Sequence, residues 1–146
     1  QLANVQVQPG DVLLNITGAS ILRTCVVPPD VLPARVNQHV AIIRAKPGVS
    51  PHYLHLHLLQ PDTKAYLLGL NAGASREAVT KAHIESVPVP DPGADRMAEF
   101  HELVAPRSSQ ALALAAEART LAALRDSLLP KLLSGELNVL DAEAVA

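Results

Sequence analysis

Histidine is the residue type that most invites a chemical role, because three of the six histidines lie close together at His52, His55 and His57. On a helix, His52 and His55 would share a face, whereas on a strand His55 and His57 would do so. Neither arrangement supplies the three ligands and nearby carboxylate of a catalytic zinc site. We therefore predict no metal site, and favour solvated histidines on a helix over residues 51–59 whose leucines are buried.

Nucleophilic catalysis and phosphate cradling find little support in the sequence. Cys25, Ser20 or Ser75 could each pair with a histidine, but none lies in a nucleophile-elbow signature. The glycines do not have the spacing of either nucleotide-binding motif. A single cysteine also excludes a disulfide scaffold. We expect a chain that is not an enzyme by itself and needs no cofactor; a small metal-dependent or hydrolytic enzyme is the alternative.

Polar and basic residues next to predicted turns point to a different chemistry. Arginine reads guanine, asparagine or glutamine reads adenine, and serine, threonine and lysine hold the phosphate backbone. The candidate contacts are Ser20, Arg23, Arg35, Asn37, Gln38, Ser75, Arg76 and Lys81.

Composition limits the kinds of partner. The 146 residues carry a net charge of -2, with 49% apolar but only 2% aromatic residues, which disfavours base stacking on rings. Residues 1–90 hold seven basic and five acidic residues, whereas residues 91–146 hold five and nine. Any nucleic-acid contact therefore belongs to the first part. No apolar run reaches 18 residues, so we expect no membrane partner and a cytoplasmic protein.

The elements that must position these residues are mixed. Short apolar runs predict strands over residues 12–16, 25–27 and 38–44. Ser50-Pro51 starts a predicted helix over residues 51–59, a second helix covers 63–70, and Thr80 caps a single turn. The pattern predicts an α+β fold in the first part.

The rest of the chain is predicted to be helical. Asp91-Pro92 is expected to start a helix to about Val104, and Pro106 to start or kink a longer one to about Leu129. Gly135 marks the end of the helix. One apolar stripe recurs at three-, four- and seven-residue steps, and it needs a partner surface. Its members are Leu114, Ala118, Leu121, Leu124, Leu128 and Leu132.

One segment resembles a known family. Residues 121–137, with Arg125-Asp126, then Leu-Leu-Pro-Lys-Leu and a Ser-Gly-Glu stop, are similar to the conserved helix end of type I restriction–modification specificity subunits. Upstream, residues 10–14, Asn37-Gln38-His39-Val40, and Gly73-Ala74-Ser75 followed by residues 87–90 are similar to parts of the family's target recognition domain. The resemblance extends to about Val139.

The resemblance implies a non-catalytic subunit that reads one half of a split double-stranded DNA target. It implies a partial recognition domain over residues 1–90, a spacer and dimerisation helix over 91–140 that pairs as an antiparallel coiled coil, and a tail over 141–146. The helix would dock methyltransferase subunits, through which the endonuclease subunit joins. It would also pair with a second recognition domain or a second copy.

The family pattern leaves a further alternative open. Its recognition domain is longer than 90 residues, so the chain would carry only part of one. A structural remnant that pairs through its helix without reading DNA is therefore a second hypothesis.

Overall fold

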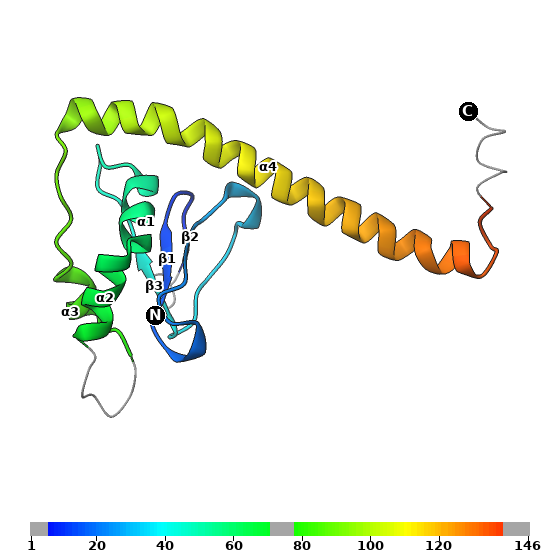
Figure 1. Cartoon of the computed structure of the whole chain (residues 1–146), viewed down its shortest axis with the longest axis horizontal. Coiled ribbons are helices and arrows are strands. Elements are labelled where there is room, and N and C mark those ends of the chain that lie inside the picture. The colour runs from blue at the N-terminus through cyan, green and yellow to red at the C-terminus, as the bar shows by residue number, and fades with distance from the viewer. Residues whose placement is uncertain (1–5, 71–77, 139–146) are drawn as a thin grey trace. The chain divides into compact units, whose positions relative to one another are not determined.

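The computed structural model describes residues 6–70 and 78–138 (Figure 1). The chain divides into two compact units, Gln1–Ala105 and Pro106–Ala146. The first unit is a mixed α+β structure with a three-stranded antiparallel sheet, and the second is helical up to Leu133. The predicted α+β class is therefore confirmed.

The sheet has the order β2-β1-β3, so its central strand is the first in the sequence. The strands are β1 (Val12–Asn15), β2 (Thr24–Val26) and β3 (Val40–Ile43), each within two residues of its predicted bounds. In β1, Val12 and Leu14 are buried while the alternate residues are half-buried, as period-two alternation requires. Val12 pairs with Val26 on one side and with Ile43 on the other.

Helices α1 (Pro51–Leu59) and α2 (Pro61–Gly69) complete the core, with α1 packed on β1 and β2. Each helix has proline at its start, where a backbone N–H would have no hydrogen-bond partner within the helix, so its absence costs nothing. The buried apolar cluster joins the sheet to these helices and to the segment before α3. It consists of Val12, Leu14, Leu22, Leu58, Leu67 and Val79.

The burial expected for α1 is wrong in part. Leu58 is buried, but Leu59 is 38% exposed, and the three histidines of the helix are half-buried rather than solvated. The reason is that β2 contacts this helix along the face that carries His55, whose Nε2 lies 3.3 Å from the carbonyl oxygen of Thr24.

The short helix α3 (Lys81–Glu85) begins with a capping box. Thr80 Oγ1 accepts a hydrogen bond from the backbone N–H of His83, and the His83 ring accepts one from the Thr80 N–H. This confirms that Thr80 caps a single turn. Two 3-10 turns, Gly18–Ser20 and Pro29–Val31, lie in the connections between strands.

A buried carboxylate fixes the start of the central strand. Asp11 is 1% exposed, and its two oxygens accept hydrogen bonds from Arg44 Nε at 2.7 Å and Nη2 at 2.8 Å. The Gln8 N–H also donates to it at 2.7 Å. Burial alone raises the pKa of Asp11, but these hydrogen bonds and the Arg44 charge together bring that pKa below its ordinary value.

The long helix α4 (Ala94–Leu133) begins later than predicted. Asp91-Pro92 does not start it, because the Asp91 side chain accepts a hydrogen bond from the Gly93 N–H at 2.9 Å and Gly93 has a φ of 82°. Asp91 therefore stabilises a turn, and the helix starts one residue after Gly93.

Pro106 lies inside α4 instead of starting a second helix. Its missing N–H leaves the Glu102 carbonyl without its helical partner, and the division between the two units falls at this proline. The first turns of α4 belong to the first unit, in which Met97 is buried. The boundary between the two compact units thus lies at 105/106.

The helix α4 continues four residues past the end predicted near Leu129, and it stops before the glycine that signals its end. Pro130 lies within the helix, which ends at Leu133, and Gly135 has a φ of 76°. This confirms the predicted stop. Within residues 6–70 and 78–138, no helix combines the length and apolar character required to cross a bilayer.

We predict that Asp11→Asn lowers the free energy of unfolding by roughly 2–3 kcal/mol, because it removes the charge that Arg44 and the Gln8 N–H compensate. Urea unfolding of the full chain measures this change. Glu99→Gln, at an exposed position beyond the first turn of α4, is the control and should change stability by less than about 0.5 kcal/mol. Equal effects of the two substitutions would contradict the role given to Asp11.

Candidate nucleic-acid interface

Polar side chains from two connections meet at one end of the sheet. They lie where β1 ends and β3 begins, since Asn15 pairs with Val40. These residues, here called the sheet-end cluster, are Asn15, Thr17, Ser20, Asn37, Gln38 and His39. Asn15 Nδ2 donates to Ser20 Oγ at 2.6 Å, and Thr17 Oγ1 lies 2.7 Å from His39 Nδ1. Two segments joined by the contact of Thr17 with His39, 22 residues apart in sequence, thus form one polar surface.

The imidazole of His39 links the two segments. Its Nε2 lies 3.4 Å from Gln38 Nε2, and its backbone N–H donates to Asn37 Oδ1 at 3.0 Å. One neutral tautomer satisfies both ring contacts, with Nδ1–H donating to Thr17 Oγ1 and Nε2 accepting from Gln38. The ring of His39 therefore positions the Gln38 amide, and its backbone N–H positions the Asn37 amide.

Backbone hydrogen bonds hold the same end of the sheet. The Ile16 N–H donates to the His39 carbonyl at 2.9 Å, and the Val79 N–H donates to the Ile16 carbonyl at 2.9 Å. Thr17 also forms an isolated bridge with Ala78. The start of α3, with Lys81, consequently follows directly from this end of the sheet.

Arg23 adjoins the cluster from the β2 side. Its carbonyl accepts from the Asn15 N–H at 2.8 Å, and the Asn15 carbonyl accepts from the Leu22 N–H at 2.8 Å. Leu22 has a φ of 62°, which is uncommon for a residue with a branched side chain, and it is 5% exposed. The connection between β1 and β2 is thus tightly constrained beside an exposed arginine.

The structure brings some of the predicted contact residues together and not others. Ser20, Asn37 and Gln38 belong to the cluster, and Arg23 borders it. Lys81 is nearby in the chain path and pairs with Glu85 at 3.5 Å.

The remaining predicted contacts fall elsewhere. Arg35 is exposed and forms an isolated bridge with Gln6, without a hydrogen bond to the cluster among the described residues. Ser75 and Arg76 lie outside the described residues.

Sequence reasoning missed Asn15 and Thr17 and named His39 within the Asn37–Val40 segment of the family resemblance, not as a contact residue. The available signal was a polar Asn-x-Thr-Gly sequence at the end of an apolar run. A side chain that follows a strand lies at the sheet end, but only the strand pairing shows that residues 37–39 meet it there.

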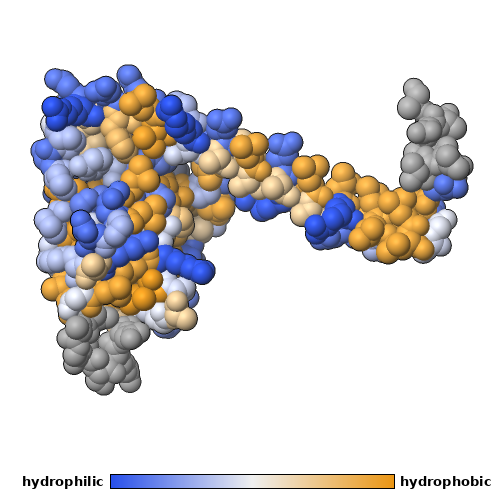
Figure 2. Space-filling view, viewed as in Figure 1, coloured by the Kyte–Doolittle hydropathy of each residue, from blue (hydrophilic) through white to orange (hydrophobic). Residues whose placement is uncertain are grey.

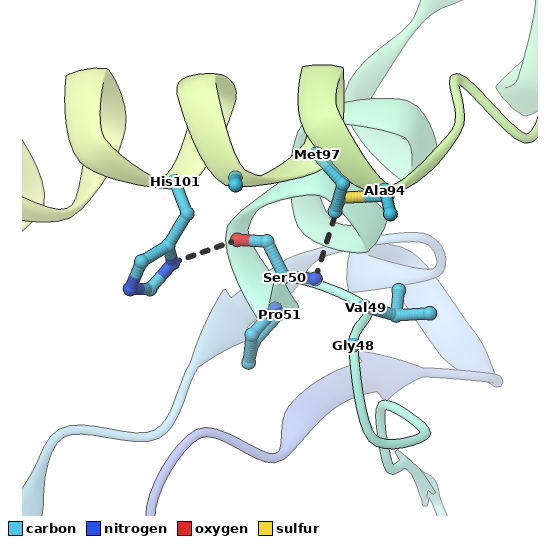
Figure 3. A pocket seen from close by; sticks show the side chains of 8 residues that line it. Gly48, Val49, Ser50, Pro51, Ala94, Met97 and His101 are labelled. Carbon is cyan, nitrogen blue, oxygen red and sulfur yellow. Dashed lines mark hydrogen bonds between the residues drawn. The ribbon is translucent and has the colours of Figure 1, made fainter.

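A second polar contact lies where α4 packs on α1 within the first unit (Figure 3). Ser50 Oγ lies 3.4 Å from His101 Nδ1, at a cavity of about 380 Å³ whose other walls are largely apolar. The Ser50 N–H donates to Met97 Sδ at 3.5 Å. The Tyr53 and Phe100 rings also meet edge to face, 5.4 Å apart. These contacts hold the first turns of α4 against α1.

This cavity is where the hydrolytic alternative would have to operate. Ser50 and His101 have a nucleophile–base pairing, yet no carboxylate that orients His101 occurs among the described residues. Cys25 is a poor nucleophile near neutral pH, because partial burial of its thiol raises its pKa even though the residue is exposed overall. Within the described part of the chain, no three His, Cys, Asp or Glu residues are grouped so as to hold a metal ion.

His52 lies beside this contact and has an altered affinity for protons. Burial lowers its pKa below the ordinary value of 6.5, and the positive charges that His101 and His55 can carry lower it further. The folded chain therefore favours a neutral His52.

We predict that this shift makes the fold less stable in mild acid. Below pH 6.5 the unfolded chain takes up a proton at His52 more readily than the folded chain, so the free energy of unfolding decreases as the pH falls. His52→Gln should reduce this decrease. Urea midpoints at about pH 7.5, 6.5 and 5.5 measure it, and identical pH dependence in the two proteins would contradict the assignment. The ionised Asp11 also stabilises the fold, but this stabilisation is lost only at lower pH, around and below 3.8, because the pKa of Asp11 is lowered from that value.

The second unit presents an apolar helix face. All six residues of the predicted stripe are exposed, and Leu114 and Leu121 are 57% and 56% exposed. Figure 2 shows hydrophobic side chains on this segment of α4. At 1.5 Å per residue, helical residues 106–133 extend over about 40 Å.

Comparison with known proteins adds no relative: no family model matches this chain, and a search of the curated proteins finds no significant match.

Proposed function

We propose that this chain is a non-catalytic DNA-recognition component of a type I restriction–modification complex. The observation that carries the proposal is the sheet-end cluster, in which amide, hydroxyl and imidazole groups from two distant segments form one surface next to an exposed arginine. Such groups are those that contact base edges and phosphates in the grooves of duplex DNA.

The local hydrogen bonds leave part of the cluster available to a ligand. Asn37 uses its Oδ1 on the His39 N–H, and Gln38 uses its Nε2 on the His39 ring. Asn37 Nδ2 and Gln38 Oε1 make no hydrogen bond among the described residues. One donor and one acceptor on adjacent residues thus remain for a base edge, and their amides are already oriented by His39.

The charge distribution supports the same surface. Residues 1–90 carry a net charge of +2, and Arg23 borders the cluster without an ion pair among the described residues. Phosphate neutralisation supplies most non-specific DNA affinity, so residues 1–90, rather than the acidic start of α4, are the part suited to DNA. Lys81 is expected to bind the DNA backbone less strongly, because it already pairs with Glu85.

We predict that Asn37→Ala together with Gln38→Ala relaxes sequence preference. A target is first selected from randomised duplexes with the wild-type chain. The double variant should then bind that target less tightly, by about 1–3 kcal/mol for each base that it no longer recognises, with little change for random duplexes. Gln60→Ala, which removes an exposed amide outside the cluster, should leave both affinities unchanged.

Two results would contradict this proposal. Equal affinity of the wild-type chain and the double variant for the selected target would remove the cluster from DNA recognition. Absence of any duplex binding by the wild-type chain at about 50 mM salt would remove DNA binding altogether. That second result would favour a structural remnant that only pairs through its helix.

The second unit is proposed to pair as an antiparallel coiled coil, with a second copy or with the helix of a second recognition domain. Leu114, Leu121 and Leu128 recur at seven residues and are exposed on one helix, so they need an apolar partner surface. A coiled coil has a second series of core positions, which here contains Leu124. Glu117 and Lys131 belong to this series, because they lie seven residues before and after Leu124.

These two charged residues favour the antiparallel orientation. In a parallel pair in register, Glu117 would face Glu117 and Lys131 would face Lys131. In an antiparallel pair centred between Leu121 and Leu124, Glu117 of each copy lies about one core layer from Lys131 of the other, so opposite charges meet. Like charges at facing positions are unfavourable, and the proposed pairing avoids them.

In the proposed complex this helix also docks methyltransferase subunits, through which the endonuclease subunit joins, and the protein acts in the cytoplasm. The separation of the chain into an α+β unit and a helical unit supports this division between DNA contact and assembly.

We predict that Leu121→Asp with Leu124→Asp abolishes association, because two charges would be buried in the central layers of the seam. Light scattering after size-exclusion chromatography measures self-association, and co-purification measures docking to the methyltransferase. Ala123→Asp, at an exposed position on the opposite face, is the control and should assemble normally. Unchanged assembly of the double variant would show that this stripe is not the pairing surface.

A further inference from the structure

A groove of about 380 Å³ lies between the connection leading into β2 and the helices α1 and α2. Arg23 and Thr24 line one wall, and Lys64 of α2 lines the other, over apolar side chains of Leu59 and Leu68. All of these residues belong to the first unit. The groove is separate from the cavity at Ser50 and His101.

Two cations meet at this groove without an anion. Arg23 is exposed and Lys64 is half-buried, and neither makes an ion pair or a side-chain hydrogen bond among the described residues. No acidic side chain of the described residues lines the groove. The two positive charges come from segments that are far apart in sequence, so the fold places both at one groove, where they attract an anion.

The wall that carries Arg23 has two further unusual features. Leu22 lines the groove with a φ of 62°, a conformation that costs free energy for a residue with a side chain. Thr24 Oγ1 is buried and meets no hydrogen-bond partner among the described residues. Backbone strain and an unsatisfied hydroxyl are each uncommon in a packed structure, and both are found at ligand sites.

We propose that this groove is a phosphate site in which Arg23 and Lys64 bind the phosphate oxygens. This proposal rests on the proposed function: the phosphate belongs to the DNA backbone, next to the bases that the sheet-end cluster contacts. The link is direct, because the Arg23 carbonyl accepts the N–H of Asn15, whose side chain belongs to that cluster.

The lining of the groove suits a phosphodiester better than an isolated ion, because Leu59 and Leu68 offer an apolar surface to an adjoining sugar. Arg23 can provide two parallel N–H donors, while Lys64 provides a point charge. Lys64 is thus assigned a phosphate-binding role, which its position within a helix does not by itself indicate.

The first test uses the full chain and inorganic phosphate at constant ionic strength, with chloride replaced. NMR signals of Arg23 Nε–H and of the Thr24 and Lys64 backbone amides should shift and saturate. Arg23→Gln should abolish saturation. Lys46→Gln, which removes one positive charge outside this groove, should titrate like the wild-type chain. Absence of phosphate-dependent shifts at the groove would overturn the proposal.

The second test measures duplex DNA affinity against salt concentration for the wild-type chain, Lys64→Gln and Lys46→Gln. Removal of one phosphate-binding cation should reduce the slope of log affinity against log salt by about 0.9 in Lys64→Gln only. An unchanged slope in Lys64→Gln would overturn the assignment of the groove to DNA. Phosphate binding without any duplex binding by the wild-type chain would support the groove as a site for a free phosphate compound, while the proposed function would fail.

Discussion

The first unit depends on the compensation of one buried charge. Asp11 precedes the central strand and is almost completely inaccessible, so its carboxylate requires partners that replace water. Arg44, just beyond the end of β3, and the N–H of Gln8 supply them. The Asp11 carbonyl also accepts from the Val27 N–H at 2.8 Å, just beyond β2. A single residue therefore connects all three strands at one end of the sheet.

The opposite end of the sheet carries the candidate interface. Because the strands are aligned by pairing at Val12 and by the Asp11 ion pair, the residues beyond Asn15 and before Val40 must meet. The polar side chains among them, including those of Thr17, Ser20 and His39, bond within the cluster rather than to the core. The rigidity of the sheet thus orients groups that lie in connections, which is the arrangement needed to contact a ligand without large reorganisation.

The helix α4 serves the two units differently. Its first turns supply Met97 to the first unit, together with the contact of His101 to Ser50. Beyond Pro106 its leucines are exposed in the second unit, where a partner helix would cover them. Proline at the boundary removes one hydrogen bond without ending the helix. This arrangement accords with a proposed protein in which one part contacts DNA and the other assembles the complex.

The sequence by itself determined the elements whose signals are local. A short apolar run predicted β1, Ser50-Pro51 predicted the start of α1, and Gly135 predicted the end of α4, because neighbouring residues set each of these. It failed at Asp91, where a side-chain bond to Gly93 competes with capping. At Pro106 the predicted helix start was wrong, because a proline within a helix removes one hydrogen bond without ending it.

Only the tertiary structure decided which distant residues meet. Thr17 approaches His39 because β1 and β3 pair in one register, and Lys64 approaches Arg23 because α2 packs beside the entry to β2. The compensation of Asp11 by Arg44 has the same origin. Such contacts depend on strand pairing and helix packing summed over the whole unit, which residue types and spacing do not encode locally.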